Sequence, residues 1–147
     1  MDSHRLKSFL AFLLLSAWLT ALFLPVVEAP YPAASNPTTA PYVIDGTGVL
    51  ASGWAGLAEA QFAWFGNLAL AWLLIRASVT HEQSSGNVYV LISCLLLTCA
   101  GSALAWDSLY LSGQTVPITH FHSGYFLWLA VMGAGAIWSL FLARNRI

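Results

Sequence analysis

The sequence contains very little charge. Of its 147 residues, five are Lys or Arg and six are Asp or Glu, so charged residues make up 7% of the chain, against about 25% in a typical soluble domain. Hydrophobic residues make up 59%. So few charges cannot build a soluble surface, whereas a bilayer accepts apolar side chains on the outside of a protein. The composition therefore favours an integral membrane protein with the lipid bilayer as its surroundings.

Several other features are missing as well. With a net charge of -1 the chain has no cluster of basic residues that would bind phosphates, so no nucleic-acid partner is expected. Phosphate-binding glycine loops, a Ser-His-Asp order, HExxH and CxxC are all absent. We therefore predict no catalytic residue, no metal and no cofactor, and favour a protein that is not an enzyme. Cys94 and Cys99 lie in an apolar run, about 140° apart on a helix, and are interpreted as packing residues.

Four apolar runs predict an all-α integral membrane protein. The expected fold is a single domain over residues 1–147, a four-transmembrane-helix bundle with spans at about 8–27, 57–76, 88–106 and 121–143. Each run is close to the ~20 residues that cross ~30 Å of hydrocarbon. The second run is short unless it begins near Gly56, which places Glu59 at the membrane boundary.

The basic residues predict the orientation. Arg5, Lys7, Arg76, Arg144 and Arg146 all fall on one side of this arrangement, so both termini are expected in the cytoplasm and the chain in the inner membrane. The first run also resembles a signal peptide. It is long for one, and Pro30 follows the best candidate cleavage site, so we expect a retained signal anchor.

The connection at about residues 28–55 is the largest segment outside the membrane. Its proline-rich first half is expected to be extended, and Asp45-Gly46 lies between β-favouring residues, which is typical of a tight hairpin. A short interfacial helix is expected at Gly53–Leu57, just before the second span.

Small residues recur at helical spacing in the last two runs. Such residues let membrane helices approach closely, so the two stripes are predicted to form the seam of the bundle. The stripes are Cys94, Thr98, Gly101, Ser102 and Ala105 in the third run, and Ala130, Gly133, Ala134 and Ile137 in the fourth. Tyr89 and Trp138 are expected in the aromatic belt at the cytoplasmic interface, and Trp64 and Trp128 in helix packing.

Polar residues gather at the predicted outer ends of the spans. The candidate outer-leaflet site contains Glu59, Asp107, His120 and His122. Carboxylates and histidines at one depth can bind a metal or carry a proton. His-x-His spacing, however, directs the two rings apart in a strand or a helix, and solvation at the interface explains these residues without a ligand.

Asn67 is the polar residue expected inside the membrane. An unpaired amide there is costly, so we predict that it hydrogen-bonds to a neighbouring helix.

Three segments carry a resemblance to known proteins. They are Gly53–Leu57 (GWAGL), Phe62–Asn67 (FAWFGN) and Gly124–Ala130 (GYFLWLA). The chain is similar to a loosely defined group of small bacterial four-span inner-membrane proteins, a resemblance that implies no activity. In size and span number it also resembles membrane immunity proteins.

The functional prediction follows from what is missing and from the helix patterns. We expect a small non-catalytic membrane protein that acts by protein–protein interaction, as an accessory subunit or an immunity-type protein. The partner is a membrane protein or a second copy of the chain. One alternative is an oligomeric transporter or channel component that uses the outer Glu, Asp and His residues. A second is a redox or metal-binding membrane subunit.

Overall fold

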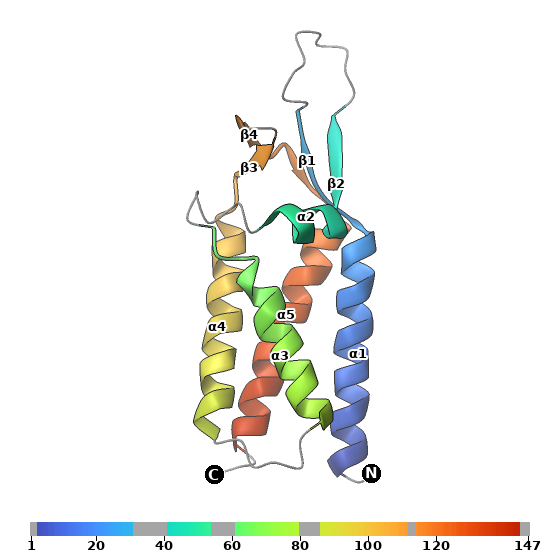
Figure 1. The fold of residues 1–147 in the computed structure, drawn as a ribbon, viewed down its shortest axis with the longest axis vertical. Coiled ribbons are helices and arrows are strands. Elements are labelled where there is room, and N and C mark those ends of the chain that lie inside the picture. The colour runs from blue at the N-terminus through green and yellow to red at the C-terminus, as the bar shows by residue number, and fades with distance from the viewer. Residues whose placement is uncertain (1–2, 31–40, 54–60, 80–85, 112–113, 145–147) are drawn as a thin grey trace.

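The protein is mostly helical, and its long helices lie side by side. The computed structural model describes residues 3–30, 41–53, 61–79, 86–111 and 114–144. Figure 1 shows α1 (Ser3–Phe23), α3 (Phe65–Val79), α4 (Gly86–Leu104) and α5 (Ser123–Arg144) running along the length of the molecule, with α3 in front of α5 and strands at one end. We call this the strand end. The opposite end, where α1 begins and α5 ends, carries Arg5, Arg76 and Arg144 and is called the basic end.

Three of these helices are long and apolar enough to cross a membrane. They are α1, α4 and α5, whose apolar segments are 19, 19 and 22 residues long. They indicate a membrane protein. The fourth expected span is shorter than predicted because α3 has 15 residues, or about 22 Å at 1.5 Å per residue. Residues 61–64, expected within this span, are not helical, and Glu59 lies outside the described residues.

The main core lies between the four long helices. Its buried residues come from all of them and include Ala11 of α1, Leu70 and Leu73 of α3, and Leu96 and Met132 of α4 and α5. Tyr89 is only 1% exposed, and its carbonyl oxygen accepts a hydrogen bond from Ser139 Oγ at 2.7 Å. Tyr89 and Trp138, expected at the interface, are therefore both buried in the core.

The two predicted small-residue stripes do not form the seam between α4 and α5. Cys94, Thr98 and Gly101 are exposed on α4 and Ala105 is exposed just after it, while Ala130, Ala134 and Ile137 are exposed on α5. The buried small residues are instead Ser93, Cys99 and Ala103 of α4, and Gly135, Ala136 and Ser139 of α5. The prediction was wrong because both faces of these helices carry small residues, so size alone does not identify the inner one.

The strands form two small sheets above the ends of the helices. In the first, β1 (Pro25–Ala29) lies between β2 (Tyr42–Asp45) and β5 (His120–Phe121), and both pairings are antiparallel. In the second, β3 (Ser108–Leu111) pairs with β4 (Gln114–Pro117). An all-α fold was expected, so the sheets correct that prediction. Pro25 ends α1, and the Val-Val pair that follows suits a strand.

The predicted hairpin at Asp45-Gly46 is replaced by the start of a helix. Asp45 is the N-cap of α2 (Gly46–Ser52), and its Oδ1 accepts a hydrogen bond from the Gly48 backbone N–H at 2.8 Å. Asp is among the preferred N-cap residues. The short helix predicted at Gly53–Leu57 falls mostly outside the described residues, since these stop at Gly53 before residue 61. A second core cluster beneath the strands joins Val26, Val27, Ile44, Ala103 and Tyr125.

Candidate functional site

Asn67 joins three helices at the centre of a hydrogen-bonded group. Its Oδ1 accepts hydrogen bonds from Trp18 Nε1 of α1 and Trp128 Nε1 of α5, both at 2.9 Å. Its Nδ2 donates to the Trp64 carbonyl oxygen at 3.1 Å. The predicted hydrogen bond to a neighbouring helix is therefore present, and there are two of them. Because Asn67 is 8% exposed, these bonds satisfy an amide that is costly to bury unpaired.

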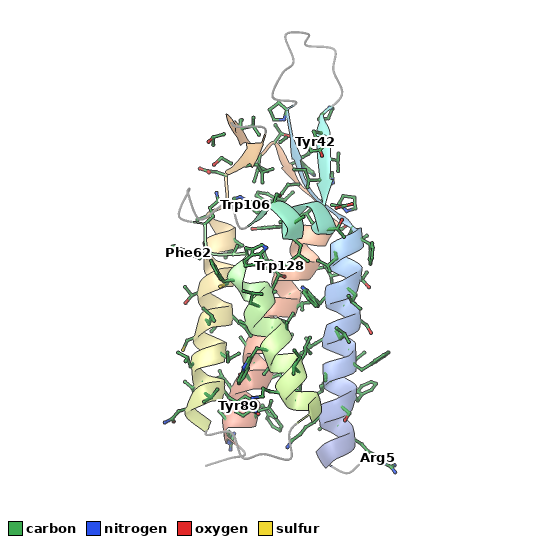
Figure 2. The ribbon with its side chains drawn as sticks, viewed as in Figure 1. Arg5, Tyr42, Phe62, Tyr89, Trp106 and Trp128 are labelled. Carbon is green, nitrogen blue, oxygen red and sulfur yellow. The ribbon has the colours of Figure 1, made fainter. Side chains whose placement is uncertain are left out.

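A cavity of about 60 Å³ lies beside Asn67, between the helices and the strand end. The sequence did not indicate it, because its walls come from segments far apart in the chain. It is lined mainly by apolar and aromatic side chains, among them Leu22, Val49, Trp64, Trp106, Tyr125 and Trp128. Figure 2 shows Trp106 where α4 meets the strand end, with Trp128 nearer the middle of the helices. Trp64 and Trp128 thus line this cavity as well as packing between helices.

Most polar atoms around the cavity already have partners. Trp64 Nε1 donates to the Leu50 carbonyl oxygen of α2 at 2.8 Å, and Tyr125 Oη donates to the Ala103 carbonyl oxygen at 2.8 Å. Trp106 differs, because its Nε1 is buried and has no hydrogen-bond partner among the residues that the structure describes. Buried N–H groups are normally satisfied, and Trp138 Nε1 in the helix core is unpaired in the same way among the described residues.

Of the predicted outer polar residues, the structure brings two together. The rings of His120 and His122 are in contact, with centroids 5.0 Å apart and planes at 70°. A regular strand or helix would separate the two rings, but the chain leaves β5 after Phe121 and turns into α5, so the two histidines do not belong to one regular element. Asp107 lies elsewhere at the strand end, where its Oδ1 accepts from Ser108 Oγ at 2.9 Å. Glu59 lies outside the described residues.

Glu28 is the partner that the sequence did not reveal. Its Oε2 lies 3.3 Å from His122 Nε2, and its carbonyl oxygen accepts from the Thr119 backbone N–H at 2.8 Å. The pairing of β1 with β5, which sets Glu28 opposite His120, brings them together. The PVVEA run was a signal for a strand, but nothing in the sequence indicated which segment it would pair with.

The polar side chains at the strand end can form an ion pair and can be solvated by water. When His122 is protonated, it and Glu28 form a salt bridge, while both side chains stay partly exposed at 29% and 27%. Within the described ranges, no group of three or more His, Cys, Asp or Glu side chains is arranged to hold a metal ion.

Asp45 is the strand-end carboxylate with a defined electrostatic environment. Hydrogen bonds from the Gly48 backbone N–H and then from the Thr47 hydroxyl, the latter at 2.7 Å, lower the pKa of Asp45 below its ordinary value of 3.8. Hydrogen bonds to the ionised form stabilise that form. Asp45 is therefore a capping residue for α2.

Comparisons with protein-family models, with curated proteins and with solved structures found no match for this chain. The geometry described above is thus the basis for a functional proposal.

Proposed function

We propose that this chain is a small non-catalytic membrane protein that acts by protein–protein interaction, as an accessory subunit of a membrane complex or as an immunity-type protein. The supporting observation is that the glycines of the two small-residue stripes are not covered by other described parts of the chain. A side chain added at Gly101 or Gly133 would meet no other atom within 4 Å. Small residues allow close helix contact in a bilayer, and within the described residues these two positions have no helix over them.

The proposal includes the cytoplasmic membrane of a bacterium, four passes and both termini in the cytoplasm. The clustering of Arg5, Arg76 and Arg144 at one end supports this orientation through the positive-inside rule. A short α3 is compatible with crossing if the bilayer thins locally or if residues 61–64 extend its apolar length.

Single cysteines test this orientation. In a chain with Cys94 and Cys99 replaced by Ser, Thr47→Cys lies exposed at the strand end and Asn87→Cys lies exposed at the basic end. A membrane-impermeant maleimide added to spheroplasts is expected to label Thr47→Cys at once and Asn87→Cys only after lysis. Labelling of both before lysis, or of Asn87→Cys alone, would overturn the proposed topology.

The interaction itself is tested by purification from native membranes in mild detergent. The wild-type chain is expected to recover a membrane protein in stoichiometric amount, and Gly101→Leu or Gly133→Leu to lose it without unfolding. Leu95→Phe is the matched control, because Leu95 is also exposed on α4 but lies about 100° from Cys94. A wild-type chain that purifies alone would contradict the proposal, as would partner recovery unchanged by both glycine variants.

The oligomeric transporter or channel alternative receives less support from the same geometry. Asn67 Oδ1 already accepts two hydrogen bonds, and the histidines do not contact the Asp107 side chain in the part of the chain that is described. Cys94 tests self-association, which the transporter alternative requires and the interaction proposal allows, because it is exposed on the small-residue face of α4 while Cys99 is buried. Copper-phenanthroline oxidation that links Cys94 to Cys94 of a second copy would favour self-association.

A further inference from the structure

Arg76 carries its charge on a helix that is short for a membrane span. α3 has 15 residues, or about 22 Å at 1.5 Å per residue, against ~30 Å of hydrocarbon. Figure 1 shows α3 ending short of the level at which α1 begins. Arg76 comes three residues before that end of α3. Its backbone therefore lies deeper from the basic end than the backbone of Arg5.

The Arg76 side chain is directed further inward. Its guanidinium carbon lies 5.4 Å from the centre of the Trp72 ring, and Trp72 is one turn earlier in α3, on the side of the strand end. Side chains on a helix are tilted toward its N-terminus, which explains this direction. The charge is therefore held closer to the hydrocarbon than it would be on a side chain extended toward the basic end.

Trp72 is held in place by the core. Its ring contacts the Tyr89 ring of α4, with centroids 6.5 Å apart and planes at 63°. Tyr89 is buried, and its carbonyl oxygen accepts the hydrogen bond from Ser139 Oγ of α5. Trp72 and Arg76 are only half-buried, so part of each side chain is accessible from outside the protein. The helices thus present a positioned guanidinium at the membrane boundary.

The charges at the basic end favour an anionic ligand. The other described basic side chains of α1 and α5 lie at this end: Arg5, Lys7 and Arg144. The described acidic residues are all at the strand end. Asp2 and Glu82 lie outside the described residues, and even if both were counted here, the chain's five Lys and Arg would exceed them. Lipid phosphates are the anions present where a guanidinium at a span end loses part of its water.

We propose that Arg76 binds the phosphate of an anionic phospholipid at the basic end. The planar guanidinium donates two N–H groups to two phosphate oxygens, the geometry that suits arginine to phosphate. The Trp72 ring fixes the guanidinium plane, and the net positive charge of this end favours a lipid with net negative charge over a zwitterionic one.

The short α3 gives the bound lipid a structural effect. Because Arg76 is held toward the hydrocarbon, the phosphate that it binds is drawn inward, and the bilayer becomes thinner beside α3. This local thinning matches the membrane to a helix of about 22 Å. The site adds a lipid ligand to the protein, and it depends neither on a protein partner nor on which side of the membrane the basic end faces.

Lipid retention by the full chain tests the site. The protein is purified in mild detergent, titrated with phosphatidylglycerol or with phosphatidylcholine of the same acyl chains, and measured for bound lipid by native mass spectrometry. We expect the wild-type chain to retain phosphatidylglycerol several-fold more tightly. Equal retention of the two lipids would overturn the proposal.

Two charge-removing variants separate a defined site from general attraction. Arg76→Gln is expected to lower the affinity for phosphatidylglycerol about tenfold, as for the loss of one charge-assisted hydrogen bond. Arg5→Gln is the matched control, because it removes the same charge from the same end at an exposed position on α1, and it should keep most of the affinity. Equal losses in the two variants would show diffuse attraction and overturn the site.

Two variants that keep the charge test the geometry. Arg76→Lys loses the pair of parallel N–H donors, and Trp72→Leu removes the ring beside the guanidinium. Both should bind phosphatidylglycerol more weakly than the wild type, and wild-type affinity in both would overturn the assigned geometry. Inorganic phosphate serves as the free-anion probe. Displacement of phosphatidylglycerol by an equal concentration of inorganic phosphate would show recognition of a free anion and overturn the lipid assignment.

Discussion

The inward and outward faces of α4 and α5 both carry small residues, but their surroundings differ. On the inward face, Gly135 lies against large side chains: an added Cβ would approach Leu70 Cδ1 to 3.1 Å and Leu96 Cδ1 to 3.4 Å. On the outward face, two residues away, an added Cβ on Gly133 would meet nothing within 4 Å. The space beside the inward Gly135 is filled by other side chains, whereas the space beside the outward Gly133 is open. A stripe of small residues therefore indicates a surface for helix contact, but it does not identify whether the contacting helix belongs to the same chain.

The largest effect is expected from a matched pair of glycine substitutions, one on each face. Gly135→Leu places a branched side chain where a Cβ alone is already tight, and we expect it to destabilise the protein by about 3 kcal/mol, the upper range for overpacking. Gly133→Leu is expected to change the stability of the isolated chain by less than about 0.5 kcal/mol. Thermal melts of purified protein in detergent measure both. Equal melting temperatures for the two variants would mean that the two faces do not differ.

The second prediction concerns the hydrogen bonds by which Asn67 of α3 joins α1 and α5. Asn67→Leu leaves the Trp18 and Trp128 indole N–H groups without their acceptor. An unsatisfied buried donor costs about 1–3 kcal/mol, but polar contacts between membrane helices average about 0.6 kcal/mol. We expect the free energy of unfolding of Asn67→Leu to fall by about 2 kcal/mol, because two donors are affected and Asn67 is almost fully buried. Thermal melts of purified protein in detergent measure this change.

Trp18→Phe is the control for Asn67→Leu. It removes one of the two donors and leaves the Trp128 bond in place. It should therefore lower the free energy of unfolding less than Asn67→Leu in the same thermal melts. If Asn67→Leu is as stable as the wild type, the hydrogen-bonded group contributes nothing to holding the helices together.

The sequence was a good guide to the long helices and a poor guide to what they contact. Long apolar runs predict α1, α4 and α5 because the hydrophobic length that a bilayer requires is a local property. Asn67 was identifiable for the same reason, since a lone amide in an apolar run must find a partner. Its partners Trp18 and Trp128 were not identifiable, because nothing local distinguishes a tryptophan that donates to Asn67 from one that lies at the interface.

The strand end was harder to predict because its structure depends on long-range pairing. Glu28 meets His122 only because β1 pairs with β5 across 94 positions of the chain. Asp45-Gly46 has two local solutions, a hairpin turn and a helix N-terminus. The helix forms here because β2 already pairs with β1, and the Gly46 N–H donates to the Leu24 carbonyl oxygen at 3.1 Å. Tertiary contacts thus decided between two structures that the dipeptide allows equally.

The smallest effect is expected at Asp45, where the strand end meets water. The pKa of Asp45 is lowered in the folded state by the Gly48 N–H and the Thr47 hydroxyl. Its ionised form therefore contributes stability at pH values above its ordinary pKa of 3.8, and the contribution is lost as pH falls through the lower pKa of the folded state. Hydrogen exchange of the Gly48 N–H should accelerate over that acidic range relative to amides in α4. Asp45→Asn keeps an N-cap acceptor that does not titrate, so its exchange should not show this acid-dependent change, and the same acceleration in Asp45→Asn would assign the effect to another group.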